Sequence, residues 1–263
     1  MPAKPENLLA RQEFILQRLQ ETGSVLVSEL CATLGASIAT IRRDLEALEG
    51  RSLLRRTRGG AVPIGPLFYE PFLNDESFQD RVSSFSDEKR RIARAAAALV
   101  RNGDTVALSG GTTTTEVMRS LKVVKGITII TNTVNVAMEL SNHKDIEVVV
   151  TGGSLRGNWF TLVGPLATRA AEMLFADIMF IGVDGISAEQ GLTCVNSLEA
   201  EFLQSLVRHS KKKVVVADHS KIGAVAKWLL CPTSEIDLLI TDNGVADEVL
   251  APFKSLDIDI MLV

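Results

Sequence analysis

Residues 105–118, TVALSGGTTTTEVM, join a short apolar run to a glycine pair, four threonines and the start of a helical pattern. An apolar run that is continuous rather than alternating is typical of a strand covered on both faces, as in a parallel sheet. The glycines allow a tight backbone turn, and the threonines stand where a helix would begin. This stretch therefore predicts a strand, a loop and a helix of an α/β fold.

Similar apolar runs recur along the chain and alternate with helical stretches. They are TVALS, ITIIT, EVVVT, IMFIGV, KVVVA, LLIT and DIMLV. Such alternation predicts a Rossmann-like α/β domain with a mostly parallel sheet. Six of the runs are followed by small or polar residues, namely SGGTTTT, NT, GGSLRG, DG, DHSK and DNG. Because the carboxyl ends of parallel strands share one edge, where ligands bind, we expect these loops to converge.

The SGGTTTT loop has the chemistry of a phosphate site. Gly110 and Gly111 allow close approach of the backbone, free N–H groups at a helix start attract an anion, and residues 112–115 add hydroxyl donors. The loop has neither the GxGxxG pattern nor a GK[ST] ending, which disfavours a dinucleotide or ATP. A glycine-rich turn whose threonines only cap the helix is the alternative.

Three residues that follow other strand ends complete the predicted site. Lys221 would bring a compact positive charge to the same phosphate, unless it is an ordinary surface lysine. Asn132 and Asp184 are expected to hydrogen-bond sugar hydroxyls, which need paired donors and acceptors. Trp159 is expected to pack under its own loop rather than stack on a ligand. The predicted effector-binding residues are Gly110, Gly111, Thr112, Thr113, Thr114, Asn132, Asp184 and Lys221.

Short helices are predicted before the first strand of the sheet. An apolar stripe predicts a helix that runs from about residue 8 to residue 22, and residues 25–27 are compatible with a strand. Ser28 as N-cap and Gly35 as a left-handed C-terminal residue bound a second helix. Ser37 caps a third helix, which Gly50 closes. The apolar face of that third helix consists of Ile38, Ile41, Leu45 and Leu48.

The opposite face of the third helix suits a DNA groove. It centres on Arg43 with small neighbours such as Thr40, and Arg42 lies at its flank. The segment LLRRTRGGA, residues 53–61, predicts a short strand and a basic turn beside the helix, as a wing would be. The predicted DNA-binding residues are Ser37, Thr40, Arg42, Arg43, Arg55, Arg56 and Arg58. The alternative is a solvated helix with Asp44 and Glu46 as salt-bridge partners.

Charge supports the DNA hypothesis, because it is unevenly distributed. Residues 1–60 hold nine Lys and Arg against seven Asp and Glu, a net charge of +2. The whole chain has a net charge of −4, so the remaining residues carry −6. An acidic body repels nucleic acid while the basic amino-terminal part attracts it.

The boundary between the two parts follows from composition. Residues 62–78 contain three prolines and scattered aromatic residues without a sustained period, which predicts a linker. A helix with Ser86 as its N-cap follows. The prediction is therefore a DNA-binding domain at 1–61, a linker at 62–79 and an effector-sensing domain at 80–263. The basic run KRR at 89–91 is interpreted as a solvated helix face.

Several other classes of protein are disfavoured. The cysteines and histidines show no spacing typical of a disulfide framework or a metal site, so we expect reduced thiols, no metal and no cofactor. No apolar run reaches the ~18 residues that cross a bilayer, and no secretory signal is recognisable. We therefore expect a soluble, cytoplasmic protein with no membrane partner.

The segments SIATIRRDLEALE and LLRRTRGGA resemble the winged helix-turn-helix signature of the DeoR family of bacterial sugar-catabolism regulators. The resemblance continues to the last strand and covers nearly the whole chain. It implies an effector domain similar to ribose-5-phosphate isomerase and glucosamine-6-phosphate deaminase. The residues that match its motifs are Gly111, Thr112, Thr113, Asp184, Ser220 and Lys221. The chain differs at Arg58, where the family often has His or Tyr, and at Ser109, where it usually has Asp.

Three functions were weighed. The resemblance implies a transcriptional regulator, usually a repressor, that binds double-stranded operator DNA and responds to a phosphorylated sugar. One recognition helix contacts few base pairs, so a homo-oligomer, a dimer or a tetramer, is expected. The second function, a sugar-phosphate isomerase or deaminase, would have Asp184 or Glu199 as its base, without a legible partner to tune it. The third is a module that joins proteins. We expect a regulator of a carbohydrate catabolic operon and not an enzyme.

Overall fold

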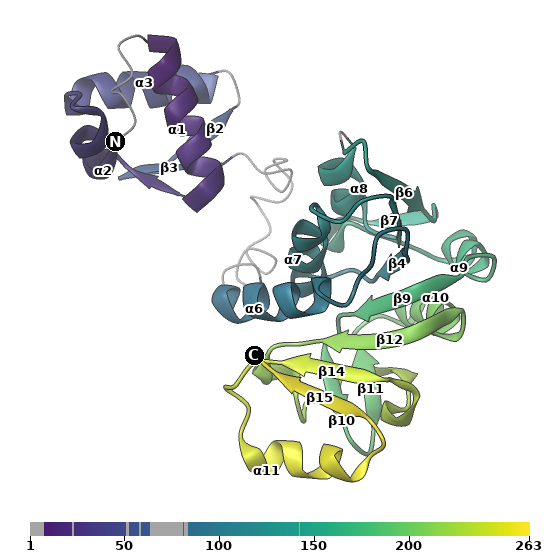
Figure 1. Ribbon diagram of the computed structural model, residues 1–263. Helices are drawn as coiled ribbons and strands as arrows, with labels where there is room; N and C mark the ends of the chain where they lie inside the picture. Colours follow the sequence, from purple (N-terminus) through teal and green to yellow (C-terminus); the bar gives the residue numbers. More distant parts are fainter. Residues whose placement is uncertain are drawn as a thin grey trace. The chain divides into compact units, whose positions relative to one another are not determined.

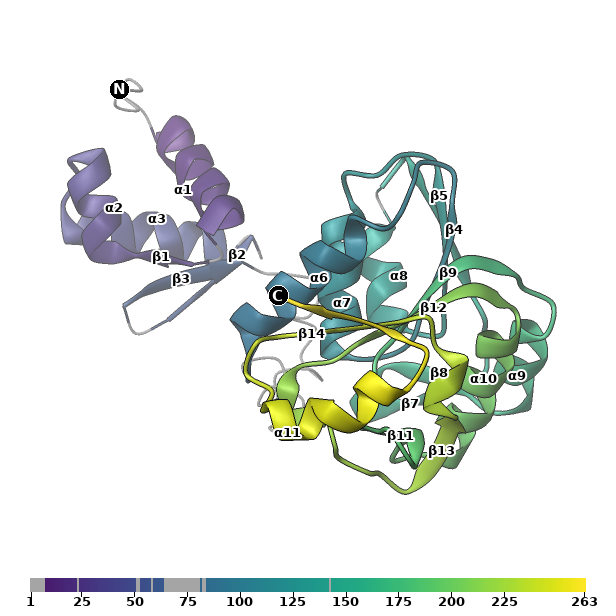
Figure 2. The same ribbon diagram turned by 60° about the horizontal axis from the view of Figure 1, so that its bottom comes forward.

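The computed structural model describes residues 8–22, 24–50, 53–57, 59–63, 81, 84–141 and 143–263. The chain divides into two compact units, Met1–Tyr69 and Glu70–Val263 (Figures 1 and 2). Among the described residues, no helix has the length and apolar character needed to cross a membrane. Cys31, Cys194 and Cys231 are all free thiols.

The smaller unit is a winged helix-turn-helix. Its elements are α1 (Leu8–Thr22), β1 (Val25–Leu26), α2 (Val27–Leu34), α3 (Ile38–Gly50), β2 (Leu54–Arg56) and β3 (Gly60–Pro63). The strands form an antiparallel sheet in the order β1-β3-β2. Buried apolar side chains from α1, α2, α3 and the sheet form one core, which includes Ile15, Leu30, Ile41, Leu45 and Leu54. The turn between α2 and α3 depends on Gly35, whose φ of 65° is in the left-handed region.

Two local expectations for the smaller unit were wrong, and one residue of the alternative interpretation of α3 is buried. Ser28 does not cap α2, because the helix begins one residue earlier and its N-cap residue is Leu26. Ile38 is 56 % exposed, since it is the first residue of α3 and the buried stripe starts at Ile41. Asp44 is buried and accepts a hydrogen bond of 3.0 Å from Arg11 of α1, so it is not an exposed partner of the helix surface.

The larger unit is a three-layer α/β domain. A seven-stranded sheet contains β4 (Thr105–Leu108), β5 (Ile127–Thr131), β6 (Ile146–Val150), β9 (Ala176–Ile181), β12 (Ser210–Val216), β14 (Leu238–Thr241) and β15 (Asp259–Leu262). The main helices are α6 (Ser86–Ala97), α7 (Thr112–Leu121), α8 (Val134–Leu140), α9 (Pro165–Ala171), α10 (Ser197–Arg208) and α11 (Asp247–Leu250). One apolar core joins α6, α7 and α8 to the sheet, and the other joins α9, α10 and α11 to it.

All seven strands correspond to the seven apolar runs of the sequence, and every pairing among them is parallel. The mostly parallel Rossmann-like sheet is thereby confirmed. Its order is β15-β14-β12-β9-β4-β5-β6. The chain runs outward in one direction from β4 and in the other from β9, so the strand order reverses between these two neighbours. In open α/β sheets a crevice forms at such a point, outside the carboxyl ends of the strands.

Shorter elements extend the carboxyl edge of the sheet. A hairpin of β7 (Ser154–Arg156) and β8 (Thr161–Val163) encloses the 3₁₀ turn Gly157–Trp159. A small antiparallel sheet contains β10 (Gly185–Ser187), β11 (Gly191–Cys194) and β13 (Trp228–Cys231). The entry to α6 differs from the prediction, because Phe85 and not Ser86 is the N-cap residue. Phe85 has a φ of 52°, which is strained for a residue with a side chain.

Candidate functional site

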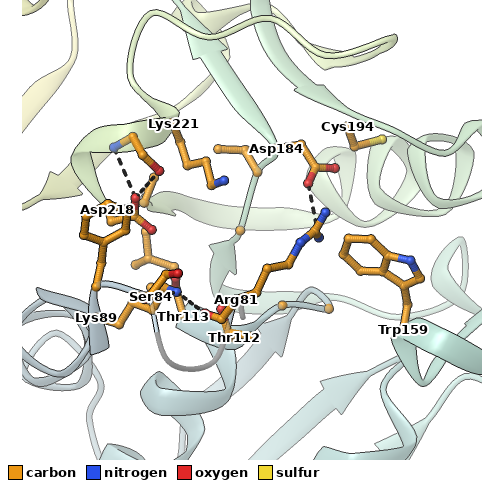
Figure 3. Close-up of a pocket in the computed structure, with 18 of the residues that line it drawn as sticks. Arg81, Ser84, Lys89, Thr112, Thr113, Trp159, Asp184, Cys194, Asp218 and Lys221 are labelled. Carbon is orange, nitrogen blue, oxygen red and sulfur yellow. Dashed lines mark hydrogen bonds and ion pairs between the residues drawn. The ribbon is translucent and has the colours of Figure 1, made fainter. Parts of the chain in front are cut away.

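A cavity of about 250 Å³ lies at the carboxyl ends of β4, β9 and β12, where the strand order of the sheet reverses (Figure 3). It collects residues from across the larger unit. Those predicted from the sequence that line it are Gly110, Gly111, Thr112, Thr113, Asp184 and Lys221. Ser220, which matches a motif of the resembled family, and Glu199, named only as a candidate base, also line it. The sequence reasoning missed other lining residues, among which are Arg81, Ser84, Lys89 and Asp218.

The Gly-Thr loop offers unoccupied donors to the cavity. Gly111 is the N-cap residue of α7, with a φ of 141° that favours glycine. Its carbonyl accepts hydrogen bonds from the hydroxyls of Thr114 (3.0 Å) and Thr115 (2.8 Å). Within the described chain, the hydroxyls of Thr112 and Thr113 and their backbone N–H groups make no hydrogen bond. These groups, at the positive end of the helix dipole, form a cradle for an anion.

Two predicted residues lie outside this cavity. Thr114 is 1 % exposed, and its hydroxyl is used by the Gly111 carbonyl. Asn132 is completely buried, and its amide donates to the carbonyl of Leu162 at 3.0 Å. The structure therefore assigns both side chains to local packing around the loops, because neither has a surface left toward the cavity.

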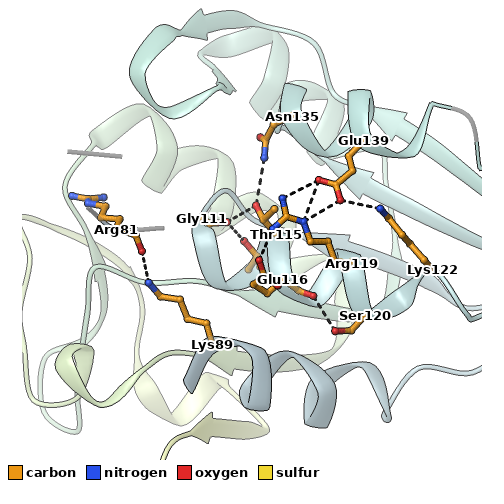
Figure 4. A network of polar contacts seen from close by, with 11 residues as sticks. Arg81, Lys89, Gly111, Thr115, Glu116, Arg119, Ser120, Lys122, Asn135 and Glu139 are labelled. Carbon is orange, nitrogen blue, oxygen red and sulfur yellow. Dashed lines mark hydrogen bonds and ion pairs between the residues drawn. The ribbon is translucent and has the colours of Figure 1, made fainter. Parts of the chain in front are cut away.

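Lys89 was interpreted as part of a solvated helix face, and that interpretation was wrong. Its side chain is 5 % exposed and lines the cavity. The ammonium group donates to the carbonyls of Arg81 (2.5 Å) and Ser84 (2.7 Å), as Figures 3 and 4 show. Burial lowers the pKa of Lys89, an effect that nearby Asp218 partly offsets. An anion in the cavity would favour the charged form of this amine.

Arg81 and Trp159 form another wall of the cavity. The guanidinium of Arg81 lies 3.9 Å from the centre of the Trp159 ring and 3.8 Å from a carboxylate oxygen of Asp184 (Figure 3). Arg156 also contacts the Trp159 ring, at 4.8 Å from its centre. Trp159 therefore lines the cavity instead of only packing under its loop. An aromatic face beside an arginine and a carboxylate suits the apolar and hydroxyl surfaces of a sugar.

Glu199 of α10 faces the same cavity. Its carboxylate is buried and accepts a hydrogen bond of 3.0 Å from Arg156. Burial raises the pKa of Glu199 to about 7, although Arg156 opposes the shift. Asp184 contributes in the same direction as burial, because a second negative charge nearby disfavours ionisation.

Ser109 and Gly110 hold the ends of β4 and β9 together. The Ser109 hydroxyl accepts a hydrogen bond of 2.8 Å from the N–H of Gly182 and is 1 % exposed. A Cβ atom on Gly110 would lie 2.5 Å from the Thr161 methyl group. The resembled family usually has Asp at position 109. In this chain the Ser109 side chain instead hydrogen-bonds to the backbone between the two strand ends. Position 110 requires glycine, because there is no room for a Cβ atom.

A polar network ties the cradle helix to its neighbour (Figure 4). The side chain of Glu139 of α8 is 5 % exposed and accepts hydrogen bonds from Arg119 of α7 (3.0 Å) and from Lys122, the C-cap residue of α7 (2.9 Å). Burial alone would raise the pKa of Glu139, but these bonds outweigh it and hold the pKa below its ordinary value. Asn135 of α8 donates to the hydroxyl of Thr115 at 3.4 Å. The position of the anion cradle thus depends on contacts with α8.

In the smaller unit, the outer face of α3 carries most of the predicted DNA contacts. Arg42 and Arg43 are exposed, and the Ser37 hydroxyl accepts a hydrogen bond of 3.1 Å from the N–H of Thr40. Arg56 donates its backbone N–H to Glu49, and its guanidinium lies 3.6 Å from Glu46. Arg42 and Arg56 border a shared hollow of about 280 Å³. The side chain of Arg55 and all of Arg58 lie outside the described residues.

No grouping of three or more histidine, cysteine, aspartate or glutamate residues is arranged for a metal ion in the described ranges. The histidine nearest to such a role is His219, which contacts Asp242 at 2.8 Å and packs edge-on against Phe85. Asp242 also accepts hydrogen bonds from the backbone N–H groups of His219 and Gly244. These contacts hold a partly exposed histidine against a buried aspartate and are those of a structural cluster.

Comparisons with known proteins agree across both units. Residues 11–65 match the model of the DeoR-like helix-turn-helix domain, and residues 84–243 match that of the DeoR C terminal sensor domain. The chain is 35 % identical to the HTH-type transcriptional regulator GolR of Listeria innocua, over 93 % of this chain and 94 % of that one. It is 34 % identical to the HTH-type transcriptional repressor GlcR of Bacillus subtilis, over 87 % and 86 %.

Two further similarities complete the comparison. The chain is 32 % identical to a putative aga operon transcriptional repressor of Escherichia coli O157:H7, over 96 % of this chain and 93 % of that one. Ribose 5-phosphate isomerase A from Methanocaldococcus jannaschii aligns with a TM-score of 0.38 and 20 % identity, covering 52 % of this chain and 55 % of that one. With matches that span both units, the chain belongs to the DeoR family of DNA-binding transcriptional regulators and not to a family of enzymes.

Proposed function

We propose that this protein represses a carbohydrate catabolic operon and that a phosphorylated sugar bound in the cavity of the larger unit controls its affinity for operator DNA. The observation that carries the proposal is the cradle at Gly111–Thr113, which presents free amide and hydroxyl donors to a cavity that Lys89 and Lys221 also line. The relatives named as repressors, one of them of the aga operon, support a role in sugar metabolism.

The phosphoryl group fits the cradle on electrostatic grounds. The start of α7 contributes a partial positive charge, and Lys89 and Lys221 add basic side chains, while Asp218 places a carboxylate on that side. The two carboxylate oxygens of Asp218 differ in their availability to a ligand. One of them already accepts hydrogen bonds from the N–H and the hydroxyl of Ser220. Amide donors and a compact ammonium together are a common way of binding phosphate.

The sugar would occupy the wall made by Arg81, Trp159 and Asp184. This wall pairs an aromatic surface with donors and an acceptor, as a polyol requires. A cavity of about 250 Å³ is slightly smaller than the ~300–1,000 Å³ that is typical of ligand sites. That size favours a sugar monophosphate over a nucleotide or an oligosaccharide. Asp184 and Lys221 keep their proposed roles, while Lys89 and Arg81 join them.

Operator binding is proposed for the outer face of α3 and the wing. Arg43 and Arg42 are exposed on α3, and Thr40 lies beside them. Arginine contacts to base edges supply specificity, whereas phosphate contacts supply salt-dependent affinity. For the sugar phosphate to act as a signal, it must bind the DNA-competent and the DNA-incompetent arrangements with different affinities.

A homo-oligomer, either a dimer or a tetramer, is part of the proposal. Large apolar side chains on and directly after α9 are strongly exposed, namely Leu166 (73 %), Met173 (75 %) and Phe175 (70 %). Surfaces of this kind are typical of protein interfaces, and two copies would present two recognition helices to repeated half-sites. Sedimentation of the full chain tests the order of assembly. We place the protein in the cytoplasm, where operator DNA and sugar phosphates occur.

The sensor half is tested by thermal shift and calorimetry with a panel of aldose and ketose monophosphates. At least one is expected to raise the melting temperature of the full chain and to change its affinity for operator DNA. The Lys221→Gln variant should lose most of the ligand-induced rise in melting temperature. The control variant, Lys254→Gln, changes an exposed lysine that does not line the cavity and should keep the rise. If no member of the panel binds, or if Lys221→Gln binds as the wild type does, the proposed site is wrong.

The DNA half is tested by fluorescence anisotropy with operator and random duplexes at several salt concentrations. Arg43→Ala should cost about 1–3 kcal/mol in operator binding, which is roughly five- to 150-fold, with a smaller loss on random DNA. Arg18→Ala, at an exposed arginine of α1, removes the same charge and is the control. Equal losses for both variants would contradict the assignment of α3 as the recognition helix.

A further inference from the structure

One carboxylate oxygen at the wall of the cavity has no hydrogen-bond partner among the described residues. Glu199 is 8 % exposed, and its Oε2 atom accepts the bond from Arg156. Its Oε1 atom makes no hydrogen bond with any described residue and lies 3.4 Å from the place where a Cβ on Gly110 would be. This atom is therefore next to the loop that begins the anion cradle. An oxygen that faces the cavity without a protein partner can form a hydrogen bond with a bound molecule.

We propose that Glu199 is protonated when the cavity holds its anionic ligand and donates its O–H to an acceptor oxygen of that ligand, so that loading takes up one proton. The inference rests on the proposed function, because it requires an anion in the Gly111–Thr113 cradle. It identifies Glu199 as a residue that selects ligands with a hydroxyl or carbonyl oxygen beside the phosphate.

Loading disfavours the charged form of Glu199 for two reasons. The ligand displaces water from a carboxylate that is already buried, and its phosphate places negative charge close to Gly110. In the empty site, burial has already raised the pKa of Glu199 to about 7. A further rise puts the loaded carboxyl in its neutral form at neutral pH. A neutral carboxyl has an O–H donor, which a carboxylate lacks.

Several charged groups face Glu199. Arg156 and Arg81 favour its charged form, and Asp184 opposes it. Cys194 stays a neutral thiol at neutral pH, because burial raises its pKa to about 11. Across the cavity, burial lowers the pKa of Lys89, and a bound anion would act in the opposite direction, so this amine is a second group whose protonation can respond to loading. A variant of Glu199 is therefore needed to separate the two sources of proton uptake.

The sign of the pH dependence follows from linkage. Below a pH of about 7, Glu199 is protonated in both states and contributes no pH dependence. Above it, the empty site must gain a proton in order to bind, so affinity falls as the pH rises toward the pKa of the loaded site. The titration of this one group lowers the ligand affinity by at most about tenfold per pH unit.

The experiment measures proton uptake by the full chain with sodium sulfate as the probe, since sulfate keeps the same charge between pH 6 and 9. Calorimetry at pH 8 in two buffers with different ionisation enthalpies gives the number of protons taken up. Glu199→Gln is expected to bind sulfate and to take up fewer protons than the wild type, by more than half a proton per sulfate bound. Its sulfate affinity should also depend less on pH. Glu201→Gln, at an exposed residue of the same helix, should match the wild type.

The outcomes separate the two proposals. Absence of sulfate binding by the wild-type chain would remove the anion cradle and this inference with it. Binding with the same proton uptake in wild type and Glu199→Gln would overturn this inference and leave the cradle intact. If the Gln variant does not fold, carbon NMR of the wild-type Glu199 carboxyl decides. A titration midpoint near 7 that rises with sulfate supports the proposal, and a midpoint that sulfate does not move overturns it.

Discussion

The tight contact between Gly110 and Thr161 permits a quantitative prediction about the loop. In Gly110→Ala, the new Cβ would lie 2.5 Å from the Cγ2 methyl of Thr161. This is about 1 Å inside the ~3.5 Å at which two carbon atoms normally touch. Thr161 is 1 % exposed, so its methyl group has little room to move. Overpacking of a buried site usually costs about 1–3 kcal/mol, and we expect Gly110→Ala to lower the free energy of unfolding by that amount.

A double-mutant cycle isolates this contact. Thr161→Ser removes the methyl group and alone should cost about 0.5–1.5 kcal/mol through the small cavity that it leaves. With the methyl absent, the alanine has room, so the double variant should be more stable than the sum of the two losses by at least 0.5 kcal/mol. The assay is urea denaturation followed by tryptophan fluorescence. It reports on the larger unit alone, because both tryptophans, Trp159 and Trp228, lie there. Strict additivity of the two changes would show that the contact is not the cause.

The other predictions concern the wing and the support of the cradle helix. In Gly60→Ala, the Cβ would lie 1.8 Å from the backbone oxygen of Val25, so pairing of β1 with β3 should fail and operator affinity should drop at least tenfold in anisotropy measurements. In Gly59→Ala the new Cβ meets nothing within 4 Å, so this variant should bind DNA normally; normal operator affinity of Gly60→Ala would refute the steric clash. Glu139→Gln should lower the free energy of unfolding by about 1–3 kcal/mol at pH 7, since it weakens charged hydrogen bonds. Because the folded pKa of Glu139 is depressed, that contribution is lost as the pH falls, and the urea curves of wild type and variant should converge in acid; a constant gap would refute this.

The framework was predictable because it depends on repeated patterns. Each strand of the parallel sheet is a continuous apolar run, and α3 has an apolar stripe opposite its arginines. Loops at the carboxyl ends of β4, β9 and β12 converge because a parallel sheet requires it. Gly111 and Lys221 could therefore be placed at one cavity from the sequence.

The rest depends on tertiary contacts that leave no local signal. Lys89 is in a basic run with two exposed arginines, and only the docking of the chain at Arg81 and Ser84 buries it. Asn132 follows a strand end like Asp184, but its amide is taken by Leu162 of the neighbouring hairpin. The sequence indicated Glu199 only as a candidate base. Nothing in the sequence predicts its hydrogen bond with Arg156, which is 43 residues away along the chain.

The four consecutive threonines after Gly111 form two pairs with different structural roles. Thr114 and Thr115 close the first turn onto the Gly111 carbonyl, whereas Thr112 and Thr113 keep their hydroxyls toward the cavity. Ligand preference can therefore diverge among related proteins at the first pair while the second pair stays fixed to preserve the turn. Deep mutational scanning of the loop should find tolerance to serine throughout, but tolerance to larger polar residues only where a hydroxyl is not tied to the backbone.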